Sequence, residues 1–214
     1  MSSTDSILLR TTAGTSLVLG VVYAAFQLHL LPRPIAQVVA RIFFFPTWPL
    51  TYLSRRSNYF TLVDSHVYLG AVPMVFMGHV SFLHARGVRA VVNLCDEYEG
   101  PVATYRKHNI TQLRIPTVDH TEPSLSDLRK AVEFIEFHKS QGSRVFVHCK
   151  AGSGRSAAVV FCWKLHANPT WSPKEVQLYL SEKRSVRRKL YLQPNIVAYY
   201  ESLQPPKSAP HNAM

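Results

Sequence analysis

The sequence predicts an α/β fold in which a central, mostly parallel sheet is flanked by helices and preceded by an N-terminal hydrophobic membrane segment. Short apolar, β-branched runs alternate along the chain with segments of helical periodicity, which is the pattern of such a sheet. One apolar run ends in a loop of small residues that leads into an Ala-rich helix. We therefore divide the chain into a membrane anchor with an interfacial segment (1–57), a catalytic domain (58–203) and a disordered tail (204–214).

The first element is an uncharged segment, residues 11–32, bracketed by Arg10 and Arg33. Roughly 20 apolar residues are enough to cross the core of a bilayer, so we expect a membrane anchor. A cleaved targeting peptide is the alternative, although no small-residue cleavage site follows. Basic residues are more numerous after this segment than before it, which places the domain in the cytosol or an equivalent matrix compartment.

A second apolar stretch covers residues 35–53 and contains Arg41, Pro46 and Pro49. Proline lacks a backbone N–H and interrupts helices, so we expect no long helix here. Trp48 is a side chain that favours the membrane interface. We interpret the stretch as an interfacial segment that lies on the membrane or packs on the domain.

The domain itself shows five strand patterns and six helix patterns. The predicted strands are residues 60–63, 67–69, 88–94, 112–115 and 145–148, the last at the centre of the sheet. The predicted helices are residues 76–86, 102–108, 124–139, 156–167 and 173–183, and a last one that begins at 193–194. The segment 172–175 reads Ser-Pro-Lys-Glu, a capping box with proline at the first helical position.

The candidate site is the segment from His148 to Ser156, between a predicted strand and a predicted helix. A loop that leads into a helix directs backbone N–H groups and the positive end of the helix dipole at one point, which favours an anion. Arg155 adds a planar guanidinium that can hold two phosphate oxygens. The same field stabilises a thiolate on Cys149. The segment therefore predicts a nucleophile inside a phosphate-binding loop formed by Lys150, Ala151, Gly152, Ser153, Gly154 and Arg155.

His148, Cys149 and Arg155 resemble the signature of the dual-specificity cysteine phosphatases. The resemblance implies the fold of that superfamily, a cysteinyl-phosphate intermediate, phosphate oxygens held by Arg155 and a supporting role for His148. It also implies that Ser156 assists the thiolate as a leaving group. No cofactor or metal is expected, because this chemistry needs none. A catalytically dead phosphate-binding adaptor is a further alternative, against which the presence of these residues argues.

Asp119 is the candidate general acid. It follows a predicted strand, on a loop able to face the phosphate-binding loop, and hydrolysis of a phosphate ester needs a group that protonates the leaving oxygen. An Asp that only caps a turn is the alternative from the sequence alone, and the family resemblance favours the catalytic role.

The segment Asp96-Glu97-Tyr98-Glu99 follows another predicted strand. It could cap the next helix, and metal binding is disfavoured. It resembles the Glu-Glu-Tyr-Glu loop of the mitochondrial phosphatidylglycerophosphate phosphatases, which implies a supporting role for Glu97, Tyr98 and Glu99. The likeness covers residues 60–203. Ser153 and Gly154 stand where those enzymes tend to have Arg-Ser, which removes a positive charge from the loop.

The formal net charge of +11 suits anionic partners, and no nucleic-acid motif is present. Lys150 either serves a substrate with more than one anionic group or is a solvated surface lysine. Residues 184–189 form a basic run that is either a solvated loop or a contact for lipid headgroups. We expect a membrane-bound enzyme acting on phosphatidylglycerophosphate, with phosphoprotein or phosphoinositide phosphatase activity as the alternative. The expected location is the matrix side of the mitochondrial inner membrane, or the cytosolic face of the endoplasmic reticulum.

Overall fold

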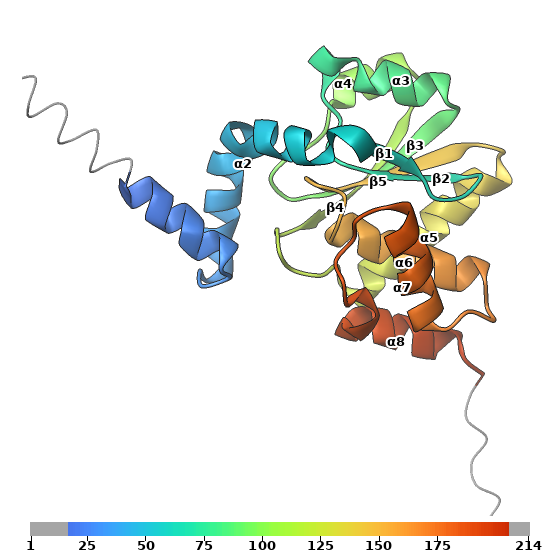
Figure 1. Ribbon diagram of the computed structural model, residues 1–214. Coiled ribbons are helices and arrows are strands. Elements are labelled where there is room, and N and C mark those ends of the chain that lie inside the picture. The colour runs from blue at the N-terminus through green and yellow to red at the C-terminus, as the bar shows by residue number, and fades with distance from the viewer. Residues whose placement is uncertain (1–16, 206–214) are drawn as a thin grey trace, which may run out of the picture.

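The computed structural model of the chain describes residues 17–205, and Figure 1 shows a sheet with helices on both sides. The helices are α2 (Arg33–Arg55), α3 (His79–Ala85), α4 (Val102–Lys107), α5 (Leu125–Ser140), α6 (Arg155–Ala167), α7 (Pro173–Lys183) and α8 (Pro194–Leu203). Three short 3₁₀ turns are η1 (Arg56–Asn58), η2 (Val75–Met77) and η3 (Leu190–Leu192). Residues 17–27 are also helical.

The five strands form one mixed, mostly parallel sheet. They are β1 (Phe60–Leu62), β2 (Val67–Gly70), β3 (Val88–Cys95), β4 (Thr111–Thr117) and β5 (Arg144–His148), in the order β1-β2-β5-β3-β4. Only β1 pairs antiparallel, with β2. The strand that carries the candidate site, β5, lies in the middle, as predicted, with β2 and β3 parallel on its two sides.

The main core lies between the sheet and helices α5, α6 and α8. Eleven of the 13 residues of α6 are buried, so this helix is covered on nearly all sides and its N-terminus is held in place. A smaller cluster on the other face of the sheet joins Val91 and Phe146 to α3 and α4. Every strand and helix predicted for residues 60–203 is present within a few residues of its expected bounds.

The prediction that Pro46 and Pro49 prevent a long helix is wrong. Helix α2 runs from Arg33 to Arg55 with both prolines inside it, and Figure 1 shows it bending sharply along its length. Proline interrupts hydrogen bonds within a helix and typically produces a kink rather than an end. Burial of Phe44 against Val72 and Met74 keeps the bent helix on the domain.

The N-terminal segment differs from the expected membrane span. Among residues 17–205 no helix is long and apolar enough to cross a membrane, and residues 11–16 of the predicted span lie outside the described part. The helix 17–27 ends in a turn at Leu28–His29. Phe26 is buried against Val39 and Ala40 of α2. The described part of this segment therefore packs on α2.

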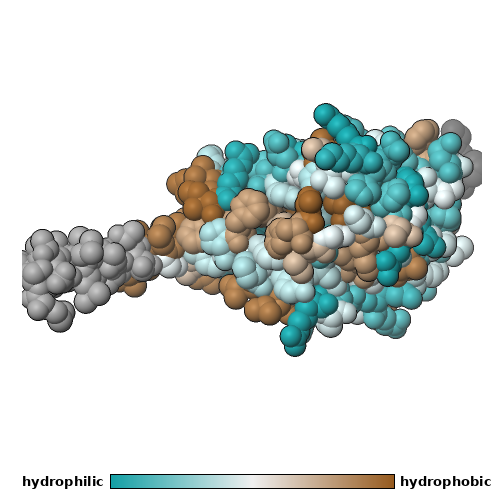
Figure 2. Space-filling model, turned by 90° about the horizontal axis from the view of Figure 1, so that it is seen from above, coloured by the Kyte–Doolittle hydropathy of each residue, from teal (hydrophilic) through white to brown (hydrophobic). Residues whose placement is uncertain are grey.

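Helix α2 has two faces of different character. Phe44 and Thr47 face the domain and are buried. We call the opposite side the outer apolar face of α2; its side chains are half to two-thirds exposed, and they are Ile35, Val38, Ile42, Phe45 and Leu53. Figure 2 shows hydrophobic patches gathered at the end of the molecule beside the N-terminal segment.

Candidate active site

The loop from Cys149 to Gly154 connects the end of β5 to the start of α6. Gly152 has a φ of 69°, a conformation that side chains rarely adopt. A Cβ atom at this position would also lie only 2.4 Å from the carbonyl oxygen of Gly70. The loop can therefore pass this close to β2 only because residue 152 is glycine.

Cys149 lies at the centre of the site with its side chain almost fully buried. Ser156 donates a hydrogen bond from Oγ to Cys149 Sγ over 3.2 Å. Burial alone would raise the pKa of this thiol, but the charge of Arg155 and the hydrogen bonds from Ser156 outweigh it and lower the pKa. The other two cysteines, Cys95 and Cys162, are free thiols whose pKa values are raised, chiefly by burial. The site thus favours a thiolate at Cys149 alone.

Arg155 is buried and held by two carboxylates. Its Nη2 and Nη1 donate to the two oxygens of Glu97 over 2.7 and 2.8 Å, a bidentate pair. Nη2 also lies 2.8 Å from Asp119 Oδ1, and Nη1 donates to the carbonyl oxygen of Thr117 over 2.8 Å. The buried Nε has no hydrogen-bond partner among the described residues. This N–H is therefore available to a phosphate oxygen.

Asp119 lies beside Arg155 and is a quarter exposed. Burial would raise the pKa of its carboxyl, but the charge of Arg155 and the neighbouring His120 lower it. His120 has a φ of 67°, and its ring lies against Phe26 and His29, with centroids 5.1 and 4.4 Å away. The N-terminal segment thus packs directly on the loop that carries the candidate acid.

The other three residues of the segment Asp96–Glu99 each contact a different side chain. Asp96 pairs with Arg41 of α2 over 3.2 Å, and Tyr98 stacks on Phe44 with ring centroids 5.0 Å apart. Glu99 is exposed and lies 3.6 Å from Arg114. Only Glu97 reaches the centre of the site. Among residues 17–205 no group of His, Cys, Asp and Glu is arranged to hold a metal ion.

His148 and Lys150 flank the cysteine on either side in the sequence. Burial lowers the pKa of His148 to about 3, so its imidazole is neutral at physiological pH. Lys150 donates from Nζ to Thr47 Oγ1 of α2 over 2.6 Å. The amino group is thereby placed at the wall of the site that α2 provides.

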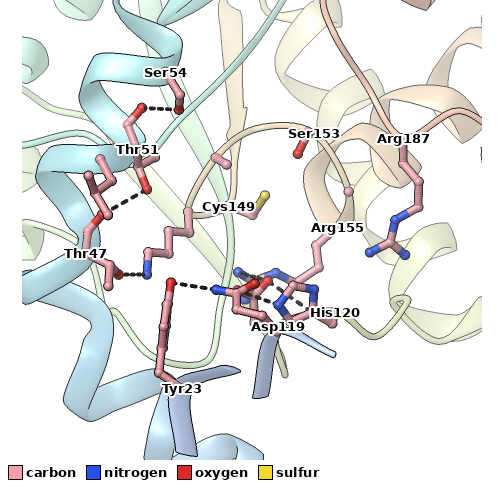
Figure 3. A pocket seen from close by; sticks show the side chains of 15 residues that line it. Tyr23, Thr47, Thr51, Ser54, Asp119, His120, Cys149, Ser153, Arg155 and Arg187 are labelled. Carbon is pink, nitrogen blue, oxygen red and sulfur yellow. Dashed lines mark hydrogen bonds and ion pairs between the residues drawn. The ribbon is translucent and has the colours of Figure 1, made fainter. Parts of the chain in front are cut away.

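A pocket of about 400 Å³ opens over the loop. Figure 3 shows Cys149 at its centre, with Asp119, His120 and Arg155 grouped below it. The α2 side of the pocket is lined by hydroxyl groups together with Tyr23 of the helix 17–27; on α2 these are Thr47, Thr51 and Ser54. The N-terminal helices therefore form part of the pocket.

Residues 67–201 match the family described as "Dual specificity phosphatase, catalytic domain", which is well over half of the chain. The chain belongs to the dual-specificity phosphatases. It is a cysteine-dependent phosphatase that hydrolyses phosphoric monoesters, and the matched residues include Cys149 and Arg155.

Two relatives of this phosphatase are identical to it at about a third of the aligned positions. Phosphatidylglycerophosphate phosphatase PTPMT2 of Arabidopsis thaliana is 34% identical over 78% of this chain and 75% of the relative. Phosphatidylglycerophosphatase and protein-tyrosine phosphatase 1 of Mus musculus is 33% identical, over 69% of this chain and 81% of the relative. The sequence-based resemblance to this branch of the family is confirmed.

Solved structures agree with the fold. The crystal structure of PTPMT1 superposes with a TM-score of 0.60 at 30% identity and covers 68% of this chain and 96% of that one. PTPMT1 in complex with PI(5)P has the same TM-score at 26% identity and covers 68% and 97%. The α/β phosphatase fold predicted from the sequence is confirmed.

Arg184 of this phosphatase binds the phosphate-binding loop, a role that the sequence did not reveal. Predicted as part of a solvated or lipid-binding run, it is instead buried, with an exposed fraction of 2%. It donates from Nε to the carbonyl oxygen of Gly152 over 2.8 Å and from Nη2 to that of Ala151 over 2.9 Å. Its Nη1 contacts Asn58 O and Thr61 Oγ1. No local pattern distinguishes it from its basic neighbours.

Proposed function

We propose that this phosphatase removes the terminal phosphate of phosphatidylglycerophosphate and releases phosphatidylglycerol, a precursor of cardiolipin. The observation that carries the proposal is the Asp96–Glu99 segment beside the phosphate-binding loop, because its Glu97 is bound to Arg155 at both oxygens. Relatives that are named for this activity support it.

In the proposed mechanism the thiolate of Cys149 attacks the phosphorus while Arg155 and the loop N–H groups hold its oxygens. The bond between phosphorus and the glycerol oxygen breaks, and Asp119 donates its proton to that oxygen. Water then attacks the cysteinyl phosphate and gives a proton back to Asp119. The sulfur–phosphorus bond breaks, inorganic phosphate leaves, and Ser156 stabilises the returning thiolate through its 3.2 Å hydrogen bond.

Asp119 is ionised in the free site, because Arg155 lowers its pKa. A bound phosphate competes for the same guanidinium and adds negative charge, and both effects raise the pKa of the Asp119 carboxyl. Substrate binding therefore promotes the protonated form that a general acid needs.

The second candidate is a phosphoinositide, because a similar structure holds PI(5)P. Phosphoproteins are the third. The test is phosphate release by the full-length protein from vesicles containing phosphatidylglycerophosphate or phosphoinositides, and from phosphopeptides, with Cys149→Ser as the blank. Preferred turnover of phosphatidylglycerophosphate supports the proposal. Preference for either of the other substrates, by tenfold or more in kcat/KM, refutes it.

The proposed lipid substrate requires contact with a membrane. We assign this contact to the outer apolar face of α2, which lies on the side of the helix away from the domain. Hydroxyl groups on another side of the same helix line the pocket. Apolar side chains on one face of a helix can enter the interface of a bilayer. The proposed location is the matrix side of the mitochondrial inner membrane, and the alternative is the cytosolic face of the endoplasmic reticulum.

Introducing negative charge on this face tests the assignment. The double substitution Val38→Glu and Ile42→Glu should reduce binding to anionic vesicles and leave hydrolysis of a soluble aryl phosphate unchanged. The matched control is Leu178→Glu on α7, which is 57% exposed but distant in the sequence. Unchanged vesicle binding by the double variant would assign membrane contact to another part of the chain.

A further inference from the structure

The catalytic pocket contains an arginine that the phosphate-binding loop does not use. Arg187 lines the pocket with Cys149. Its backbone is fixed on both sides, because its N–H donates to the carbonyl oxygen of Ser153 over 2.8 Å and its own carbonyl accepts from Gln177 Nε2 over 3.2 Å. Within residues 17–205 its guanidinium makes no hydrogen bond or ion pair with another side chain. The backbone of Arg187 is therefore held in place, and its exposed guanidinium has no counter-ion in the described part of the chain.

The Arg187 guanidinium lies beside Gly154. A Cβ atom at residue 154 would be 3.5 Å from Arg187 Nη2 and 3.7 Å from its Cζ. The guanidinium thus lies over the loop residue that immediately precedes Arg155. Ser153 is also small, so no loop side chain fills this space. A guanidinium from the segment after α7 thus lies beside an uncharged part of the loop.

The other basic groups of the site already have hydrogen-bond partners, although the partner of Lys150 is an uncharged hydroxyl. Arg155 is paired with Glu97 and Asp119, Arg184 is buried against loop carbonyls, and Lys150 is hydrogen-bonded to Thr47. Figure 3 shows Arg187 on the opposite side of Cys149 from Thr47. A phosphate bound at Cys149 therefore has Arg187 on one side and the α2 wall on the other.

We propose that Arg187 binds a second anionic group of the substrate and so selects headgroups that carry a phosphodiester in addition to the phosphomonoester that is cleaved. This inference rests on the proposed lipid phosphatase function and names the residue that recognises the headgroup. A guanidinium suits the task because it presents several N–H donors in one plane to the oxygens of a phosphodiester. Such an interaction strengthens binding and leaves the chemical step unchanged.

The test compares two soluble substrates in which the phosphate that is cleaved is attached to a primary hydroxyl of glycerol. One is glycerol 3-phosphate, and the other is the deacylated headgroup, glycerophosphoglycerophosphate, which adds a phosphodiester. The wild-type protein should prefer the deacylated headgroup in kcat/KM. Arg187→Gln should abolish most of that preference through KM, a loss of about 10- to 100-fold that is typical of one charge-assisted hydrogen bond. Turnover of glycerol 3-phosphate should fall by a smaller factor, because that substrate lacks the phosphodiester that the arginine binds.

The matched control is Arg188→Gln, which removes the same charge from the neighbouring exposed residue, outside the catalytic pocket. It should keep the preference. Three results would overturn the proposal: an unchanged preference in Arg187→Gln, an equal loss on both substrates, or an equal effect of Arg188→Gln. Vesicles of phosphatidylglycerophosphate form a separate arm. Suppose the wild type fails to hydrolyse these vesicles while its preference for the deacylated headgroup over glycerol 3-phosphate still depends on Arg187. In that case the lipid assignment fails and the second anion site stands.

Discussion

The ion pair between Glu97 and Arg155 provides the most direct test of how the site is built. Both side chains are almost completely buried, with exposed fractions of 1% and 2%. The substitution Glu97→Gln keeps the size of the side chain and removes its charge. Arg155 then keeps Asp119 and the Thr117 carbonyl as partners but loses its bidentate carboxylate.

The expected loss of stability is large. Removing one partner of a buried ion pair costs about 3–5 kcal/mol, and glutamine, which keeps one acceptor, should place this variant near 3 kcal/mol. For a chain of this size that free energy corresponds to a melting temperature lower by about 6–12 °C. The value of kcat/KM should fall by about 100-fold, because a misplaced guanidinium no longer positions the phosphate.

The assay is thermal unfolding followed by circular dichroism, together with hydrolysis of an aryl phosphate. Glu99→Gln is the matched control in the same segment, because Glu99 is 81% exposed and lies 3.6 Å from Arg114. An exposed pair contributes little, so its melting temperature should change by less than about 2 °C. If Glu97→Gln melts and reacts like Glu99→Gln, the reasoning about the buried pair is wrong.

Four further predictions concern the loop and the acid. Cys149→Ser should abolish turnover and retain substrate binding, and turnover by this variant near the parent rate would show that the reaction does not need the thiolate. Asp119→Asn should slow release of a glycerol leaving group by about 100- to 10,000-fold but an activated aryl group much less, as measured by kcat for each substrate. Because the thiol of Cys149 has a lowered pKa, its alkylation by iodoacetamide should reach half-maximal rate below pH 9, and Ser156→Ala should move that midpoint upward. Gly152→Ala should eliminate activity, since its Cβ would lie 2.4 Å from the Gly70 carbonyl oxygen; a near-normal rate would refute the close approach.

The parts of the fold that depend on local sequence could be predicted. Strand and helix positions follow from hydrophobic periodicity and capping residues, which act over a few residues. The phosphate-binding loop was identifiable for the same reason, because Cys149, Gly152 and Arg155 lie within one short segment. Asp119 follows a predicted strand on a loop able to face the phosphate-binding loop, and the structure brings its Oδ1 within 2.8 Å of Arg155 Nη2.

The parts that depend on contacts between distant segments could not be predicted. The burial of Arg184 arises from its position beside the loop after folding, and it belongs to the same basic run as exposed Arg188. Similarly, Phe44 has enough contacts in the folded domain to keep α2 helical past two prolines, which outweighs their local preference. The hydroxyl groups of α2 carried no signal of their own, because threonine and serine occur on every surface.

The contacts of Arg184 also determine when during synthesis the site can form. This single side chain joins the phosphate-binding loop at Gly152 to Asn58 and Thr61, which lie more than 120 positions before Arg184 in the chain. A growing chain that already contains Cys149 and Arg155 still lacks the group that fixes the loop carbonyls. The loop carbonyls therefore gain these hydrogen bonds only after residue 184 has joined the folded domain, later than the synthesis of the signature sequence itself.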